Sequence, residues 1–256
     1  MYNAGTPRPL RVSQESFARP VGRPRRAVSL MRRYEAAALL PDLSVQHVTR
    51  TAPAHPIFEE TAAGFARGTL LQTPSGPVAV EDLLPGDYVE TSDGAEPVLW
   101  IGSTTYVPRV EDSESILTTL YRVTGGAFGP DQHGADMVFG PAARFRIRRD
   151  KFRETIGHDS VFVPLADYAD GDRVIPVQPG GSVQMYHVAL REHKSLRIGD
   201  FEIESYHPGP GLRRELGPAL METFLSLFPN LSAIEDFGEL SCPRTSREAV
   251  LRLAGH

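Results

Sequence analysis

From residue 64 onward, short apolar segments alternate with turn signals. The segments are rich in Val, Ile, Phe and Tyr, and Gly, Pro and Asp separate them, which is typical of short β-strands. Because no long helical pattern intervenes, the sequence favours an all-β sandwich or another complex β fold over βαβ units. Asp93-Gly94 predicts a hairpin turn. The predicted strands cover residues 70–72, 77–80, 88–91, 97–101, 145–148, 161–163, 174–177, 183–188, 196–198 and 201–204.

The N-terminal part of the chain has a different pattern. Residues 1–26 are rich in Pro, Arg and Gly and are predicted to be irregular. Residues 27–40 predict a short helix that ends before Pro41. We therefore interpret residues 1–63 as an irregular or helical N-terminal extension that precedes a β domain over residues 64–209.

The C-terminal part, residues 210–256, is predicted to be a short helical tail. Pro218 suits the first position of a helix that continues over residues 219–228. Thr245 and Glu248 have the spacing of a capping box and predict a second helix over residues 247–254.

Composition limits the chemistry and the location that we expect. The 256 residues include one cysteine, Cys242, so neither an internal disulfide nor a Cys₄ or Cys₂His₂ zinc site is expected. No run of about 18 apolar residues is present, so no membrane span is predicted. A cytoplasmic location is the expectation.

Charge is unevenly distributed along the chain. Residues 1–33 contain eight arginines and one acidic residue, whereas the whole chain carries a net charge of −5. This arm either binds an anionic partner, remains solvated, or folds back onto the acidic body. Phe17 is the one aromatic residue among these arginines, so the sequence does not favour nucleic acid. The arginines predicted to contact a partner are Arg23, Arg25, Arg26, Arg32 and Arg33.

Two segments carry a family resemblance. Residues 64–102 read GFARGTLLQTPSGPVAVEDLLPGDYVETSDGAEPVLWIG, and residues 183–208 read VQMYHVALREHKSLRIGDFEIESYHP. This ordered set resembles the Hint domain, the hedgehog/intein autoprocessing fold, in its bacterial branch. The resemblance covers about residues 64–209. It implies a flat, horseshoe-shaped, all-β fold in which the first residue and the last strand meet at one site.

The resemblance also implies a self-cleavage reaction. A thiol or hydroxyl on the first residue attacks the preceding carbonyl, and the histidine of a Thr-x-x-His motif protonates the scissile amide. Here the nucleophile position is Gly64. The segment that best matches the motif is residues 140–143, with Gly140 at the threonine position and Ala143 at the histidine position. Because both groups are missing, we predict a domain that no longer processes itself, and enzyme activity is not expected.

The histidines near the end of the domain allow three interpretations. His187 and His193 lie six residues apart and would share one face of a regular strand, and Ser205 follows in the closing segment. With Gly64 and Ala143 they form a vestigial site, or the histidines bind a metal with Glu192 or Glu204, or they form structural hydrogen bonds. We expect no cofactor and no metal.

Three functions follow from these features. The preferred one is a degenerate Hint-fold module that binds a protein partner or a second copy of itself. The second is residual autoprocessing near Gly64 by a Ser, a Thr or water, which would separate residues 1–63 from the rest; Thr61 and Thr69 are candidate nucleophiles. The third is an enzyme that acts on an external substrate through the histidines.

Overall fold

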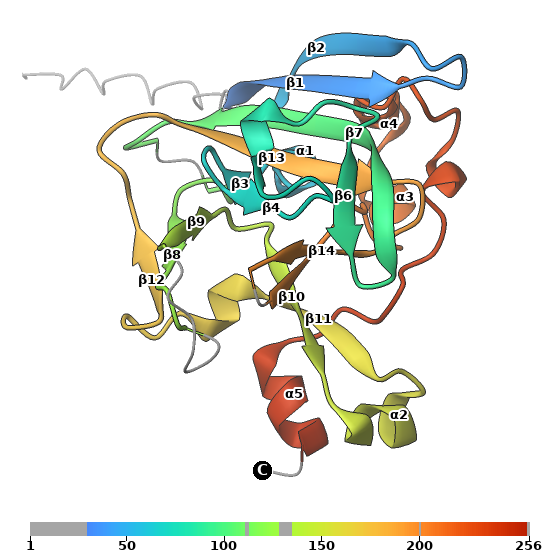
Figure 1. The fold of residues 1–256 in the computed structure, drawn as a ribbon. Coiled ribbons are helices and arrows are strands. Elements are labelled where there is room, and N and C mark those ends of the chain that lie inside the picture. The colour runs from blue at the N-terminus through green and yellow to red at the C-terminus, as the bar shows by residue number, and fades with distance from the viewer. Residues whose placement is uncertain (1–29, 111–112, 128–134, 200, 255–256) are drawn as a thin grey trace, which may run out of the picture.

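The computed structural model describes residues 30–110, 113–127, 135–199 and 201–254 and has a mostly β architecture. Within these residues, thirteen strands form one curled sheet and two short strands form a second sheet (Figure 1). The mostly β fold predicted from the sequence is confirmed. The strands are β1 (Met31–Leu39), β2 (Val45–Pro53), β3 (Phe65–Ala66), β4 (Leu70–Leu71), β5 (Val78–Ala79), β6 (Tyr88–Thr91), β7 (Gly94–Tyr106), β8 (Leu120–Val123), β9 (Met137–Phe139), β10 (Arg144–Arg148), β11 (Ser160–Pro164), β12 (Val174–Val177), β13 (Val183–Leu190), β14 (Ser195–Ile198) and β15 (Phe201–Glu204).

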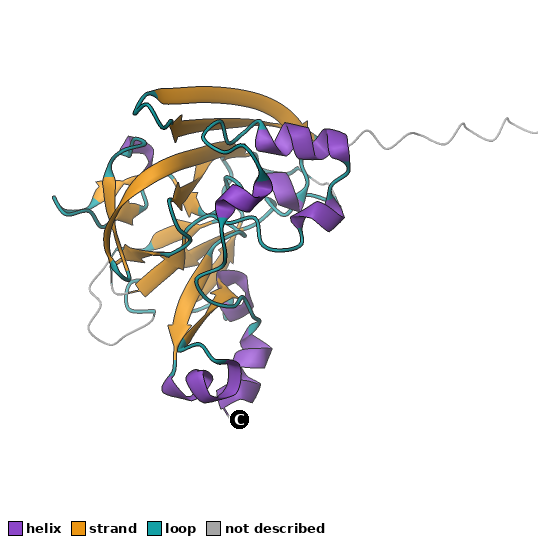
Figure 2. Ribbon diagram, turned by 90° about the vertical axis from the view of Figure 1, so that its right-hand side faces the viewer, coloured by secondary structure: helices purple, strands orange, loops and turns teal. Residues whose placement is uncertain are grey.

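The described helical segments are short. They are α1 (Pro56–Glu59), η1 (Val80–Asp82), α2 (Asp150–Ile156), η2 (Leu165–Tyr168), α3 (Leu212–Glu215), α4 (Pro218–Leu225), η3 (Ile234–Phe237) and α5 (Arg247–Ala254). Figure 2 shows one group of helices beside the β1–β2 hairpin and another at the end of the molecule where the chain terminates. None of the described helices is long and apolar enough to cross a membrane.

The long strand β7 organises the main sheet. It pairs antiparallel with β6, β13 and β1, and β13 also pairs with the short strand β3. Phe65 on β3 lies opposite Tyr186 on β13 and also opposite Phe139 on β9. As a result, the start of the family-like segment is enclosed between two strands of the sheet.

The predicted helix over residues 27–40 is wrong, because residues 31–39 form strand β1. Alternate residues of β1, including Arg32, Tyr34, Ala36 and Ala38, are buried, as expected for a strand with one covered face. β1 pairs with β2 on one side and with β7 on the other. This pairing and burial outweigh the helix propensity of the alanine run.

Segments upstream and downstream of the family-like domain pack into one hydrophobic core around Trp100, the single tryptophan. Trp100 is buried, its ring stacks on Phe228 with centroids 4.4 Å apart, and its indole N–H donates to the Leu227 carbonyl at 2.7 Å. Phe58 from α1 and Phe224 from α4 belong to the same cluster. Residues on both sides of the family-like domain are therefore parts of its fold.

The two predicted C-terminal helices form as α4 and α5, but the predicted cap of α5 is wrong. The Ser246 hydroxyl, instead of the Thr245 hydroxyl, accepts the Ala249 backbone N–H at 3.3 Å. The Thr245 N–H donates to the Phe162 carbonyl at 2.8 Å, which continues the isolated bridge between Phe162 and Arg244. Thr245 is drawn into contact with β11, and the next residue takes the capping position.

Candidate functional site at the Ala63–Gly64 junction

The peptide that corresponds to a cleavage point is held by backbone hydrogen bonds from two sides. The Gly64 N–H donates to the Tyr186 carbonyl at 3.0 Å, and the Gly64 carbonyl accepts the Gly140 N–H at 2.9 Å. The Ala63 carbonyl accepts the Ala142 N–H at 3.0 Å. The structure thus brings the Gly64 position together with the segment that matches the histidine motif.

The His187 ring packs against the side of Gly64 where a nucleophilic side chain would begin. A Cβ atom on Gly64 would lie 2.7 Å from His187 Cδ2 and 3.0 Å from Nε2, closer than real Cβ atoms approach. His187 Nδ1 lies 2.8 Å from the Glu60 carbonyl, so Nδ1 carries the proton. Nε2 is buried and has no hydrogen-bond partner among the described residues. Gly64 is therefore the residue type that this packing allows.

Gly140 is constrained even more tightly. A Cβ atom there would lie 2.1 Å from the Ala63 carbonyl oxygen, so the two backbones can approach this closely because Gly140 has no side chain. Ala143, at the histidine position, is buried in the main core, and its carbonyl accepts the Leu165 N–H at 2.9 Å. A histidine at residue 143 would have to displace core side chains.

A buried ion cluster centred on Glu204 lies beside this junction. Glu204 is 2% exposed; its Oε1 lies 2.8 Å from Arg244 Nε, and its Oε2 lies 3.5 Å from Arg144 Nη1. Arg144 also pairs with Glu60 at 3.2 Å. Burial by itself would raise the pKa of Glu204, but His193 and the two arginines outweigh it and lower that pKa to about 2. Within this cluster, two guanidinium groups balance two carboxylates.

His193 faces the same carboxylate from another loop. Its Nδ1 accepts the Ser241 N–H at 3.0 Å, which leaves the proton on Nε2. Nε2 lies 3.1 Å from Glu204 Oε1, at an angle outside hydrogen-bond geometry. The prediction that His187 and His193 lie on one regular strand is wrong, because β13 ends at Leu190 and β14 begins at Ser195.

The other predicted site residues have structural contacts. Ser205 is buried, and its hydroxyl accepts the Lys194 N–H at 3.1 Å. The Glu192 side chain is 76% exposed and lies 3.9 Å from Lys194. Across the part of the chain that the structure describes, no group of three His, Cys, Asp or Glu side chains converges as metal ligands would. The charged partners in the Glu204 cluster, Arg144, Arg244 and Glu60, were not predicted, because no local pattern connects them.

The sequence profile of the Hint domain family matches residues 63–210, more than half of the chain. The chain belongs to the Hint domain family. Among solved structures, a splice-inactive variant of the AceL NrdHF class 3 split intein is similar, with 8% identity, a TM-score of 0.39, and coverage of 56% of this chain and 97% of that one. A bacterial intein-like domain from Clostridium thermocellum has 20% identity and a TM-score of 0.37, with 57% and 99% covered. Among curated proteins, none matches the sequence.

The basic arm that precedes this Hint domain is not a uniform charged surface. Arg23, Arg25 and Arg26 lie outside the described residues. The prediction that Arg32 contacts a partner is wrong, because its side chain is 5% exposed and pairs with the buried Glu59. Arg33 is exposed and lies 2.7 Å from Glu35, so it remains available at the surface. The alternation of β1 separates the two neighbours onto opposite faces.

His187 should make the Hint domain less stable in mild acid. Burial lowers the pKa of His187 to about 4, against an ordinary value of 6.5, so below pH 6.5 the unfolded chain binds a proton that the folded chain does not. The free energy of unfolding should fall between pH 6.5 and pH 4, by up to about 3 kcal/mol from this group. Urea unfolding at a series of pH values would measure it. The variant His187→Gln should show a shallower slope, and an unchanged slope would contradict the assignment.

Proposed function

We propose that this protein is a non-processing Hint domain that acts as a binding or structural module. The observation that carries the proposal is the packing of His187 against Gly64, where a Cβ atom would lie 2.7 Å from the ring. An acyl shift needs a thiol or hydroxyl on that residue to attack the preceding carbonyl. Gly64 has no such group, and the space for one is filled.

The segment upstream of Gly64 supports the same proposal. In a processing reaction this segment would be separated from the domain, yet here β1 pairs with β7, and Phe58 and Ala62 lie in the core around Trp100. Glu59 is fully buried and pairs with Arg32, which joins α1 to β1. These contacts favour a chain that works in one piece.

The alternative nucleophiles are already engaged. Thr61 and Thr69 are buried, and their hydroxyls donate to the carbonyls of Phe58 at 2.6 Å and Ala66 at 2.8 Å. His187 and His193 are also buried, so a substrate in solution has no direct access to them. These contacts disfavour both residual processing and an external reaction at the histidines.

An open sheet edge supports a role in association. Among the described strands, β2 pairs with β1 alone, so its outer backbone groups face away from the sheet. An unpaired edge can accept a strand from a protein partner or from a second copy. We propose that the module binds through such a surface, with the exposed Arg33 and the preceding arm as further contacts for an anionic partner.

Intact mass spectrometry of freshly expressed full-length protein tests the absence of processing. After long incubation, with and without a thiol, we expect one species of 28.1 kDa. Fragments that join at residue 64 would overturn the proposal and would require a nucleophile or an activated water at the junction. Size-exclusion chromatography with light scattering of the same uncleaved protein tests self-association.

Restoring the missing groups should not restore cleavage. In the double variant Gly64→Cys/Ala143→His, the new thiol meets the His187 ring and the new imidazole enters the main core, so neither side chain reaches a reactive position. We expect an uncleaved chain that unfolds at a lower urea concentration, by about 1–3 kcal/mol for each overpacked site.

The same mass measurement, with and without thiol, checks this outcome. Gly64→Cys alone and Gly68→Cys are suitable controls, because a Cβ at Gly68 meets no atom within 4 Å, although its positive φ of 86° adds some backbone strain. Thiol-dependent fragments from the double variant would mean that the site needs only its two side chains to react.

A further inference from the structure

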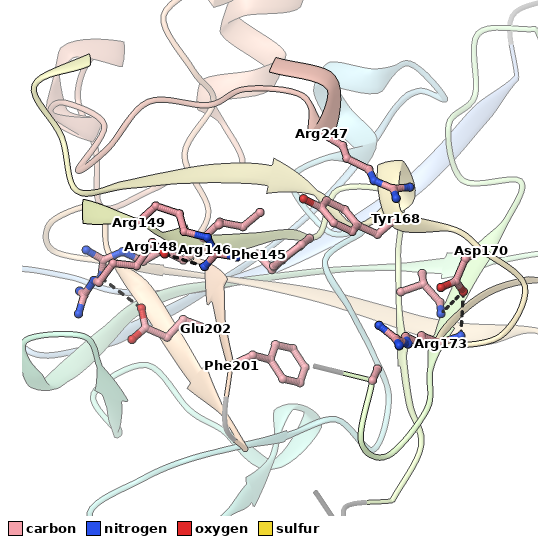
Figure 3. Close-up of a pocket in the computed structure, with 13 residues that line it drawn as sticks. Phe145, Arg146, Arg148, Arg149, Tyr168, Asp170, Arg173, Phe201, Glu202 and Arg247 are labelled. Atoms are coloured by element: carbon pink, nitrogen blue, oxygen red, sulfur yellow. Dashed lines mark hydrogen bonds and ion pairs between the residues drawn. The ribbon is translucent and has the colours of Figure 1, made fainter. Parts of the chain in front are cut away.

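A cavity of about 530 Å³ lies between β10, β15, η2, the start of β12 and the start of α5 (Figure 3). This volume is in the range of sites that take small molecules. The residues around it do not include Gly64, His187 or Glu204, so the cavity is separate from the junction. Its ligand chemistry is independent of processing.

The cavity is strongly cationic and has aromatic walls. Five arginines and two carboxylates line it, together with the rings of Phe145, Tyr168 and Phe201. Figure 3 shows the aromatic rings between the arginines of the β10 segment on one side and two further arginines on the other. The five arginines are Arg146, Arg148, Arg149, Arg173 and Arg247.

Both carboxylates in the cavity already have hydrogen-bond partners. Glu202 accepts the Ser195 hydroxyl at 2.6 Å and pairs with Arg146 at 3.2 Å. Asp170 Oδ1 accepts the backbone N–H groups of residues 172, 173 and 174 at 2.9, 2.8 and 3.1 Å. These hydrogen bonds lower the pKa of Asp170 to about 2, so it is ionised and fixes the turn before β12. Neither carboxylate pairs with an arginine other than Arg146.

The side chains of three arginines of the cavity form no ion pair within the described ranges, although the backbone N–H of Arg247 donates to Asp167 Oδ2 at 3.0 Å. Arg149 donates to the Arg148 carbonyl at 2.9 Å, and Arg247 lies over the Tyr168 ring at 4.9 Å. Arg247 also donates to the Asp167 carbonyl at 3.5 Å, and Arg173 has no side-chain bond to a described residue. A guanidinium group has five N–H donors, so each of the three retains several for a ligand.

We propose that this cavity binds a phosphorylated small molecule that carries a planar ring, with a nucleoside diphosphate as the representative class. Guanidinium groups match phosphate oxygens in paired hydrogen bonds, which makes Arg149, Arg173 and Arg247 suited to the phosphates. Phe201 and Tyr168 line the cavity with half-buried rings, and Arg247 lies over the Tyr168 ring, so aromatic surface for the ligand's ring lies next to the guanidinium groups. The proposal does not depend on whether the Hint domain processes itself.

Isothermal titration calorimetry of the full-length protein at low salt tests the ligand class. ADP should bind, inorganic pyrophosphate should bind more weakly, and adenosine should bind weakest, because the cavity supplies both charge and ring contacts. Affinity for ADP should fall as salt is added. No binding of ADP would overturn the proposal, and so would equal binding of ADP and adenosine.

Substitutions locate the binding. Arg173→Ala should lower the affinity for ADP by about tenfold, and Arg173→Ala/Arg247→Ala should lower it by about 100-fold, as expected for the loss of charge-assisted hydrogen bonds. Arg214→Ala is the matched control, because Arg214 is exposed and does not line the cavity, and it should leave affinity unchanged. Thermal unfolding would establish that each variant is folded. ADP affinity that survives the double substitution would place binding elsewhere, for example on the arginines of residues 1–33, and would overturn the proposal.

Discussion

Replacing Glu204 with alanine should lower the free energy of unfolding by about 3–5 kcal/mol. Among the described residues, Glu204 is the carboxylate that contacts both Arg244, at 2.8 Å, and Arg144, at 3.5 Å, and it is 2% exposed. Without it, Arg144 keeps the carboxylate of Glu60, whereas Arg244 keeps the neutral carbonyl of His207, so one guanidinium charge of the cluster is left unbalanced. Removing one partner of a buried pair costs more than the pair contributes, because a charge is left in a low-dielectric site.

Urea unfolding at pH 7 measures this change. The matched control is Glu248→Ala, which removes an exposed pair with Arg252 on α5 and should change stability by less than about 0.5 kcal/mol. The double variant Glu204→Ala/Arg244→Ala should recover part of the loss, which a double-mutant cycle would quantify as coupling. A loss below about 1 kcal/mol in Glu204→Ala would mean that water solvates the remaining charges and that the Glu204 cluster does not order the junction.

Stability should also decrease in acid through the same residue. The folded pKa of Glu204 is about 2, below its ordinary value of 4.5, so its contribution is present above pH 4.5 and is lost as the pH falls toward 2. This window lies below the one in which His187 acts. The Glu204→Ala variant should have a shallower slope there, and Asp170, whose pKa is also lowered to about 2, keeps part of it. Acid unfolding followed by circular dichroism would separate them.

The strands of the Hint domain could be predicted because their chemistry is local. Residues 88–91 and 174–177 are short segments rich in Val, Ile and Tyr between Gly, Pro and Asp turns, and both form strands with those bounds, β6 and β12. The hairpin at Asp93-Gly94 forms between β6 and β7, and Gly94 has a φ of 111°. Such turns are specified by neighbouring residues, so a single sequence is enough.

β1 could not be predicted from local propensity. Its run of alanines is typical of a helix, and the strand exists because β7, about 65 residues later, supplies a partner from Tyr34 to Ala38. The burial of Arg32 depends in the same way on Glu59. From the sequence alone, a charged residue in an arginine-rich segment is predicted to be solvated unless its distant partner is known.

The meeting of the two motif segments at the candidate site could be predicted from the sequence, but the contacts around them could not. The ordered motifs placed Gly64 and Ala143 at the two reactive positions, and the structure brings both segments together through the hydrogen bonds of Ala63 and Gly64. The cluster of Glu60, Arg144, Glu204 and Arg244 comes from four separate segments, so no spacing in the sequence connects its members. This network fixes the ends of the segments that meet at the junction.

Glu59→Ala should destabilise the chain by about 3–5 kcal/mol, because it removes the contact that holds the upstream segment on the Hint domain. Glu59 is fully buried; its carboxylate accepts Arg32 Nε at 2.5 Å, the Ser115 hydroxyl at 2.7 Å and the Ile116 N–H at 2.7 Å. The Leu117 N–H also donates to it, at 3.2 Å. Truncation leaves a buried guanidinium and two backbone donors without their acceptor.

Urea unfolding measures the loss, and hydrogen exchange locates it. Protection should decrease first in β1 and β2, because these strands are joined to α1 through this carboxylate. Arg33→Ala, which removes an exposed pair one residue away, is the control and should leave protection of the hairpin unchanged. If Glu59→Ala kept full protection in β1, pairing with β7 alone would hold the upstream segment. The ion pair would then give no support to an uncleaved chain, while Gly64 would still lack a nucleophilic side chain.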